Sequence, residues 1–100
     1  MKYVLLSHDD ELSVYSVPDI VAEKLNEYCS EFADKWLWIS PYAKKYQTAM
    51  GISYGAHDFI DYLNEWIFPD TPAVLIETLN NVWDSSDVPE KYRKCECFNF

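Results

Sequence analysis

Two stretches at the start of the chain have the hydrophobic and polar pattern of β-strands. The residues 2–7 are mainly aliphatic, aromatic and β-branched. In 11–17 the residues alternate, with Leu12 and Val14 on one side of a strand and Ser13 and Tyr15 on the other. Polar residues also separate the two stretches, and Asp side chains there stabilise a turn by accepting hydrogen bonds from nearby backbone amides. This pattern predicts an N-terminal β-hairpin.

A helical period of three to four residues follows the hairpin. Ser16, Pro18 and Asp19 supply a capping hydroxyl, an early proline and an acid in the order expected at a helix start. The apolar residues at helical spacing are Ile20, Val21, Leu25, Tyr28, Cys29, Phe32, Trp36 and Ile39. They predict an amphipathic helix that runs to about Trp38, and Pro41 disfavours its continuation.

The second half of the chain predicts further strands and a second helix. Residues 47–54 have apolar side chains at alternate positions, so we expect a short strand there. The next apolar stripe consists of Phe59, Ile60, Leu63, Trp66 and Ile67. It predicts a second amphipathic helix that begins near Gly55 and ends before Pro69. The run 73–79 predicts a largely buried strand suited to a sheet interior, and the tail 91–100 is expected to add an edge strand.

Together these elements predict an α+β fold in which two amphipathic helices pack on one face of a small, mainly antiparallel sheet. The element order is β-β-α-β-α-β, with a C-terminal edge strand. At 100 residues, 49% of them hydrophobic, the chain is expected to form a single domain over 1–100. The three cysteines are sparse and odd in number, and the apolar run before Ser7 is too short for a signal peptide or a membrane span. We therefore expect a cytoplasmic protein with no membrane contact.

Charge is distributed unevenly along the chain. The 17 acids and 8 bases give a net charge of −9, which disfavours direct binding to nucleic-acid phosphates or anionic lipid. Between Tyr46 and Glu90 there is no Lys or Arg, but there are eight acids. A surface of one sign selects partners by charge, so this stretch favours a basic protein surface as the partner, including one that normally binds nucleic acid.

Acids also repeat at helical spacing in both predicted helices, so that each set lines one helical face. The first acidic row is Glu23, Glu27 and Glu31, and the second acidic row is Asp58, Asp61 and Glu65. Solubility alone explains such rows, and Lys35 is placed to balance Glu31 four residues away. The alternative is that the rows dock onto a basic partner, which would relieve their repulsion and speed the encounter.

Aromatic residues near these acids are candidate contact anchors, because Tyr and Trp bury a large area with few rotatable bonds. Tyr62 lies off the apolar stripe of the second helix, and Trp83 lies in an acidic loop. Trp38 lies off the stripe of the first helix. For these three residues, packing in the core is an equally good explanation. Trp36 and Trp66 fall on the apolar stripes, so we expect both in the core.

Two residue pairs could carry chemistry. Zinc sites normally need two close pairs of ligands, and Cys95-x-Cys97 has no second pair. His57 adjoins Asp58, but neighbours on a helix point about 100° apart, so we expect them not to face a shared substrate. The chain has no nucleophile elbow, phosphate-binding glycine loop or His-Glu-x-x-His pair. We therefore predict no catalytic residues, no metal and no cofactor.

In size, charge and α+β pattern, the chain resembles the small acidic inhibitors of bacteria and their mobile elements, namely immunity proteins, antitoxins and phage-encoded anti-defence proteins. The resemblance implies a non-catalytic interaction module, an inhibitor or nucleic-acid mimic that binds a basic protein surface. The residues expected to bind the partner are the two acidic rows, Tyr62 and Trp83. One alternative is a self-associating structural domain that forms a homodimer. The other is a small enzyme or metal-binding protein that uses Cys95 and Cys97.

Overall fold

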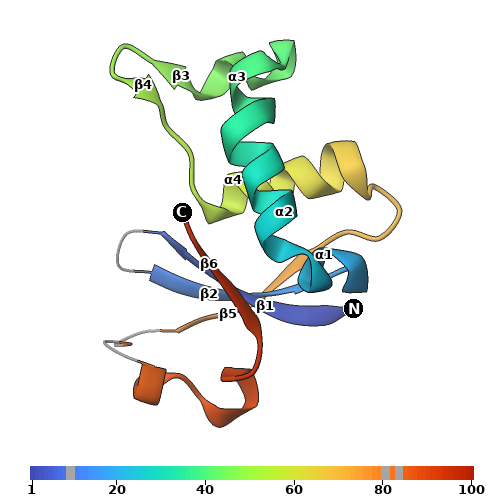
Figure 1. Cartoon of the computed structure of the whole chain (residues 1–100), viewed down its shortest axis with the longest axis vertical. Coiled ribbons are helices and arrows are strands. Elements are labelled where there is room, and N and C mark those ends of the chain that lie inside the picture. The colour runs from blue at the N-terminus through green and yellow to red at the C-terminus, as the bar shows by residue number, and fades with distance from the viewer. Residues whose placement is uncertain (9–10, 80–81, 83–84) are drawn as a thin grey trace.

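The predicted N-terminal hairpin forms the middle of a four-stranded sheet. The computed structural model describes residues 1–8, 11–79, 82 and 85–100. Within them, β1 (Lys2–His8) pairs antiparallel with β2 (Glu11–Val17) over seven residue pairs (Figure 1). The hairpin is therefore confirmed, while its turn residues 9–10 lie outside the described residues.

One further strand lies at each edge of this hairpin. β5 (Val74–Leu79) pairs antiparallel with β2, and β6 (Glu96–Asn99) pairs parallel with β1, which gives the strand order β5-β2-β1-β6. Just beyond β6, the backbone N–H of Phe100 donates to the carbonyl oxygen of Ser7 at 2.8 Å. The mainly antiparallel α+β architecture and the C-terminal edge strand are confirmed.

The position of β5 differs from the prediction. We expected 73–79 to lie largely buried in a sheet interior. Among the described residues, however, β5 has a strand neighbour on one side only, and Val74, Leu75 and Ile76 are exposed. The prediction was wrong because an apolar, β-branched run indicates that a segment forms a strand, but not whether another strand covers its outer side.

The first predicted helix is present as a series of helical segments. They are α1 (Asp19–Glu23), α2 (Leu25–Ser30), a π-helical stretch (Glu31–Trp36) and α3 (Leu37–Ile39). The backbone of Lys24 leaves the helical region, with φ −124° and ψ 38°, and so separates α1 from α2. Ser40 has extended backbone and ends the series immediately before Pro41, as the sequence predicts.

The second predicted helix is also present, but the segment between the helices differs from the prediction. α4 (Ala56–Tyr62) continues directly into a π-helical stretch (Leu63–Ile67). Between the helices lie a 3-10 helix (Pro41–Tyr46) and a separate small hairpin of β3 (Gln47–Thr48) and β4 (Gly51–Ile52). The expected single strand over 47–54 becomes two, because Gly51 turns the chain with a φ of 121° that other residues rarely adopt.

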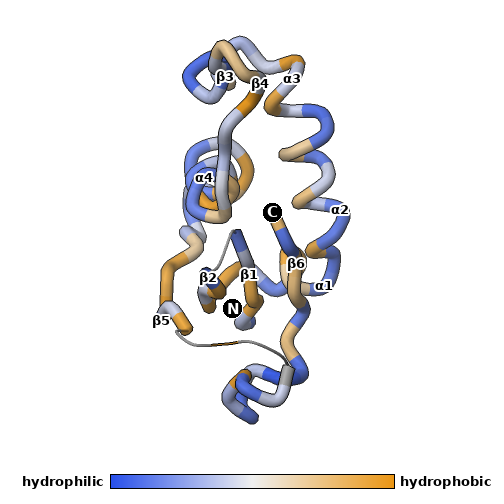
Figure 2. Tube along the Cα trace, turned by 90° about the vertical axis from the view of Figure 1, so that its left-hand side faces the viewer, coloured by the Kyte–Doolittle hydropathy of each residue, from blue (hydrophilic) through white to orange (hydrophobic). Residues whose placement is uncertain are grey.

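The helices cover one face of the sheet, as predicted (Figure 2). Phe32 of the first helix is fully buried in the core on this side. The side chains of Val4, Leu6 and Tyr15 face it from the strands. Phe32 contacts the rings of Trp36, Tyr54, Phe59, Tyr62 and Phe100 at centroid distances of 5.1 to 6.4 Å. This aromatic cluster joins the first helix to the second helix and to the C-terminus.

The other face of the sheet is covered by the segment between β5 and β6, which the sequence did not predict. This segment contains the 3-10 turns Ser85–Asp87 and Glu90–Tyr92. A second apolar cluster forms here from Leu5, Val14, Leu79, Val88 and Tyr92. The Tyr92 hydroxyl also donates to the Glu77 carboxylate at 2.7 Å, which fastens the segment to β5. The central strands are therefore buried on both faces.

The central position of Phe32 gives a stability prediction. Phe32→Ala should lower the free energy of unfolding by about 3–5 kcal/mol, because it removes a fully buried ring and leaves a cavity between the helices. Urea unfolding followed by tryptophan fluorescence measures this change. Ile39→Ala, at a residue that is 79% exposed, is the control and should change stability by less than about 0.5 kcal/mol. Equal losses in the two variants would contradict the assignment of Phe32 to the core.

Candidate interaction surface

Asp58, the first residue of the second acidic row, has a structural role. Its Oδ2 accepts a hydrogen bond from the backbone N–H of Gly55 at 2.8 Å, and so caps the start of α4. Its Oδ1 lies 3.4 Å from Nε2 of His57. The imidazole is long enough to reach back to the neighbouring carboxylate, and the His57 side chain is 76% exposed. With its side chain only 16% exposed, Asp58 offers little to a partner.

Asp61 and Glu65 remain exposed on successive turns of the second helix. A base lies near them, because the 3-10 helix that precedes β3 brings Lys45 to this side of the molecule. The pKa of Lys45 is raised, first by its hydrogen bond with Tyr46 and then by the negative charges of Glu65 and Asp61. The second acidic row is therefore reduced to two accessible carboxylates with a lysine nearby.

Asp61 also lies close to the sheet. Burial raises the pKa of the Tyr15 hydroxyl, and the negative charges of Asp61 and Glu11 raise it further. Tyr15 belongs to β2, where it stands opposite Leu75 of β5. The negative charge of Asp61 therefore acts on β2, the strand next to the exposed edge strand β5.

The first acidic row is partly neutralised. Glu23 lies 3.2 Å from Nζ of Lys2, and Glu31 lies 3.3 Å from Nζ of Lys35. The sequence indicated the second pair, but not the first, because Lys2 comes from the start of β1. Both pairs are more than half exposed, so each stabilises the fold by only about 0–1 kcal/mol. Glu27 is the member of the row without an ion pair in the described part of the chain.

The two acidic rows lie on separate helices that contact each other. The helices pack together through Phe32 and Tyr62, whose ring centroids are 5.1 Å apart. Burial raises the pKa of the Tyr62 hydroxyl, and the negative charge of Glu31 raises it further. The first acidic row therefore acts on the second helix at Glu31.

The aromatic residues are distributed differently from the prediction. Tyr62 is 4% exposed and packs 5.0 Å from Trp36, so it belongs to the core and is not a contact anchor. The first helix crosses this side of α4 and buries it, which widens the apolar stripe beyond what the spacing indicates. Trp36, which we expected in the core, is partly buried and packs against it, whereas Trp38 is 66% exposed. Trp83 lies outside the described residues.

Trp66 is at the surface, not in the core as predicted. It is 43% exposed and lies against Tyr42, with 4.5 Å between ring centroids. Tyr42 is itself 62% exposed, and it is not among the residues predicted to bind a partner. Its position directly after Pro41, where the first helix has ended, is the signal that could have indicated an outward side chain. We call Tyr42 and Trp66 the aromatic pair, and Glu65 adjoins it in sequence.

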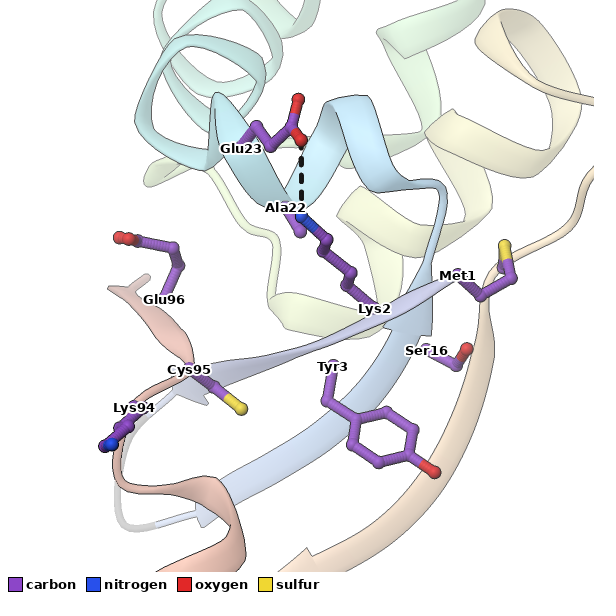
Figure 3. A pocket seen from close by; sticks show the side chains of 9 residues that line it. All are labelled: Met1, Lys2, Tyr3, Ser16, Ala22, Glu23, Lys94, Cys95 and Glu96. Carbon is purple, nitrogen blue, oxygen red and sulfur yellow. Dashed lines mark hydrogen bonds and ion pairs between the residues drawn. The ribbon is translucent and has the colours of Figure 1, made fainter.

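A separate open cavity of about 590 Å³ lies at the start of β1 and β6. Its lining residues are Met1, Lys2, Tyr3, Ser16, Ala22, Glu23, Lys94, Cys95 and Glu96. Figure 3 shows the thiol of Cys95 pointing toward Tyr3, while Lys94 and Glu96 point outward. Bases and acids both line this cavity, so it has no single charge preference, and no histidine lies there to activate the thiol.

The cysteines give no support to thiol or metal chemistry. Burial raises the pKa of Cys29 to about 12 and also raises those of Cys95 and Cys97, which disfavours the reactive thiolate. No three His, Cys, Asp or Glu side chains are placed to hold one metal ion within residues 1–8, 11–79, 82 and 85–100. Over the same residues, no helix has the length and apolar character needed to cross a membrane.

The chain shows no match to any protein-family model, to any curated protein or to any solved structure. The candidate surface therefore depends on geometry and charge alone. Of the residues predicted to bind a partner, Asp61 and Glu65 lie together and exposed, and the aromatic pair adds two that the sequence did not indicate. Glu23, Glu27 and Glu31 lie on the other helix.

The capping role of Asp58 can be tested by comparing two aspartates of the same helix. Asp58→Ala should lower the free energy of unfolding by about 1 kcal/mol, because the N–H of Gly55 loses its acceptor. Asp61→Ala should change it by less than about 0.5 kcal/mol, since Asp61 is exposed. Urea unfolding measures both values. If Asp61→Ala destabilised the protein as much as Asp58→Ala, the division of roles within the second acidic row would be wrong.

Proposed function

We propose that this protein is a non-catalytic interaction module that binds a basic protein surface through Asp61, Glu65 and the aromatic pair. The observation that carries the proposal is the exposure of these two carboxylates on successive helical turns beside the contacting rings of Tyr42 and Trp66. Large aromatic residues supply most of the energy in many interfaces, and surrounding charges supply specificity and encounter rate. The site combines both kinds of group.

The overall charge supports the same role. A net charge of −9 on 100 residues creates a negative field that attracts basic proteins and repels nucleic acid. Lys45 offsets part of this field locally, so the partner must present more than one base to Asp61 and Glu65. The first acidic row, of which Glu27 has no ion pair among the described residues, would steer the encounter from the other helix.

An inhibitor of the immunity, antitoxin or anti-defence type, acting in the cytoplasm, is the biological role that we propose for this module. The three thiols are unpaired, which suits a reducing compartment. Such inhibitors act by occupying a surface of another protein and need no catalytic group of their own. A mimic of nucleic acid would place carboxylates at the positions where a basic protein binds phosphates.

Charge reversal tests which acids matter. The Asp61→Lys, Glu65→Lys double variant should capture the basic partner from a lysate of the source cells about tenfold less well than wild type, and release it at lower salt. The matched control is Glu90→Lys, Glu96→Lys, which makes the same change of net charge at two other exposed acids. Quantitative mass spectrometry of the captured proteins gives the comparison. Equal capture by all three proteins would rule out this surface, and equal loss in both variants would show that only net charge matters.

The aromatic pair gives a separate test. Trp66→Ala should weaken binding of the same partner by about 2 kcal/mol, because it removes the largest side chain next to Glu65 and leaves Tyr42 without its neighbouring ring. Trp38→Ala is the control, since Trp38 is a more exposed tryptophan away from the second acidic row. Titration calorimetry with the purified partner measures both affinities. A greater loss in Trp38→Ala would move the binding surface to the end of the first helix.

A further inference from the structure

The outer edge of β5 is both apolar and exposed, which is unusual for an edge strand. Val74, Leu75 and Ile76 are consecutive and are 54%, 51% and 42% exposed. Leu75 stands opposite Tyr15 and so points to the helical face, while Val74 points to the other face, so both sides of this edge are apolar. In the described part of the chain β5 pairs only with β2, and the backbone groups of its outer side therefore have no strand partner.

This edge has little of the protection that natural edge strands carry. Lysines, prolines and inward-pointing charges normally prevent such an edge from pairing with another chain. The charged residue of β5 is Glu77, which is engaged by the Tyr92 hydroxyl at 2.7 Å and by Nζ of Lys91 at 3.8 Å. A single irregularity in the pairing, at Ile76, is the remaining protective feature. The edge is thus open to an added strand.

Acidic side chains lie along the helical side of this edge. Asn64 fixes the second helix over the start of β5, because its amide both donates to the carbonyl of Ala73 at 3.0 Å and accepts from its N–H at 2.7 Å. Asp61 is one turn earlier on the same helical face as Asn64. A cavity of about 160 Å³ lies nearby between α4 and the sheet, lined in part by Glu11, Tyr15 and Leu75.

We propose that the partner docks by adding an extended segment to the outer edge of β5, with basic side chains on the helical side, toward Asp61 and Glu11, and apolar side chains on the opposite side, against Val74. The proposal rests on the proposed function and specifies how the basic partner is held. In this mode of recognition, main-chain hydrogen bonds supply affinity and alternate side chains supply specificity. The exposed edge supplies the main-chain groups. The apolar side chains and the adjacent carboxylates supply contacts for alternate side chains of the added strand.

A second copy of this chain fits the edge less well. Pairing β5 with β5 would bring the Asp61 and Glu11 carboxylates of two molecules toward each other, and each molecule has a net charge of −9. Like charges placed opposite each other across a sheet are destabilising. A basic segment reverses this sign, so charge complementarity selects it over self-pairing.

The test uses two synthetic peptides and the isotope-labelled full-length protein. The first peptide is Lys-Val-Lys-Val-Lys-Val-Lys with blocked ends. The second has the same sequence with every internal amide N-methylated, which keeps the charges and side chains but removes the donors needed for sheet pairing. Amide chemical shifts should change along Val74–Leu79 with the first peptide, and the second should bind about tenfold more weakly. Val74→Thr should weaken binding of the first peptide, whereas the control Ile39→Thr should not.

Each other outcome would overturn strand addition. Equal binding of both peptides, with shifts confined to the region of Asp61 and Glu65, would show attraction by charge alone and leave the proposed function standing. No binding of either peptide at millimolar concentration would reject the edge as a docking site, and the charge-reversal experiment would still decide the proposed function. A dimer in sedimentation, with β5 amides already protected from hydrogen exchange, would show that a second copy covers the edge.

Discussion

The pairing of β1 with β2 is the interaction on which the rest of the structure depends. It runs over seven residue pairs, and side chains from both of its faces are buried. Val4 and Tyr15 face the helices, while Leu5 and Val14 face the segment before β6. The hairpin also supplies the inner neighbours of both edge strands. Both edge strands and both apolar clusters are therefore built on one local structure that forms from adjacent residues.

The sequence predicts the elements that depend on local pattern. It does not predict burial that depends on a segment distant in the chain. Strand alternation, helical spacing and the proline at residue 41 place the hairpin and both helices correctly. The same patterns could not show that β5 lies at an edge, because its composition is the same whether one neighbour or two are present. Tyr62 is buried and Trp66 is exposed for a related reason. The crossing of the first helix, not the spacing within the second helix, decides which side of the second helix is covered.

The acids that repeat at helical spacing have different roles in the fold. Asp58 is used by its own helix as a cap, Glu23 and Glu31 have lysine partners, and Asp61 and Glu65 are left to solvent. The helix cap and the pairing of Glu31 with Lys35 could be inferred from neighbours in sequence. The pairing of Glu23 with Lys2 and the approach of Lys45 to Asp61 and Glu65 depend on contacts across the fold. Surface charge in so small a protein is therefore set by topology as much as by composition.

The parallel pairing of β6 with β1 has a consequence for the order of folding. It joins Leu6 to Phe98, so nearly the whole chain lies in the loop that this pairing closes. Contacts of such long sequence separation form slowly, because the entropy of closing the loop is lost before the contact is gained. The hairpin and helices can assemble first, with β6 arriving last. Since Phe100 contacts Phe32, arrival of the C-terminus would also complete the aromatic cluster, and its departure would be the first step of unfolding.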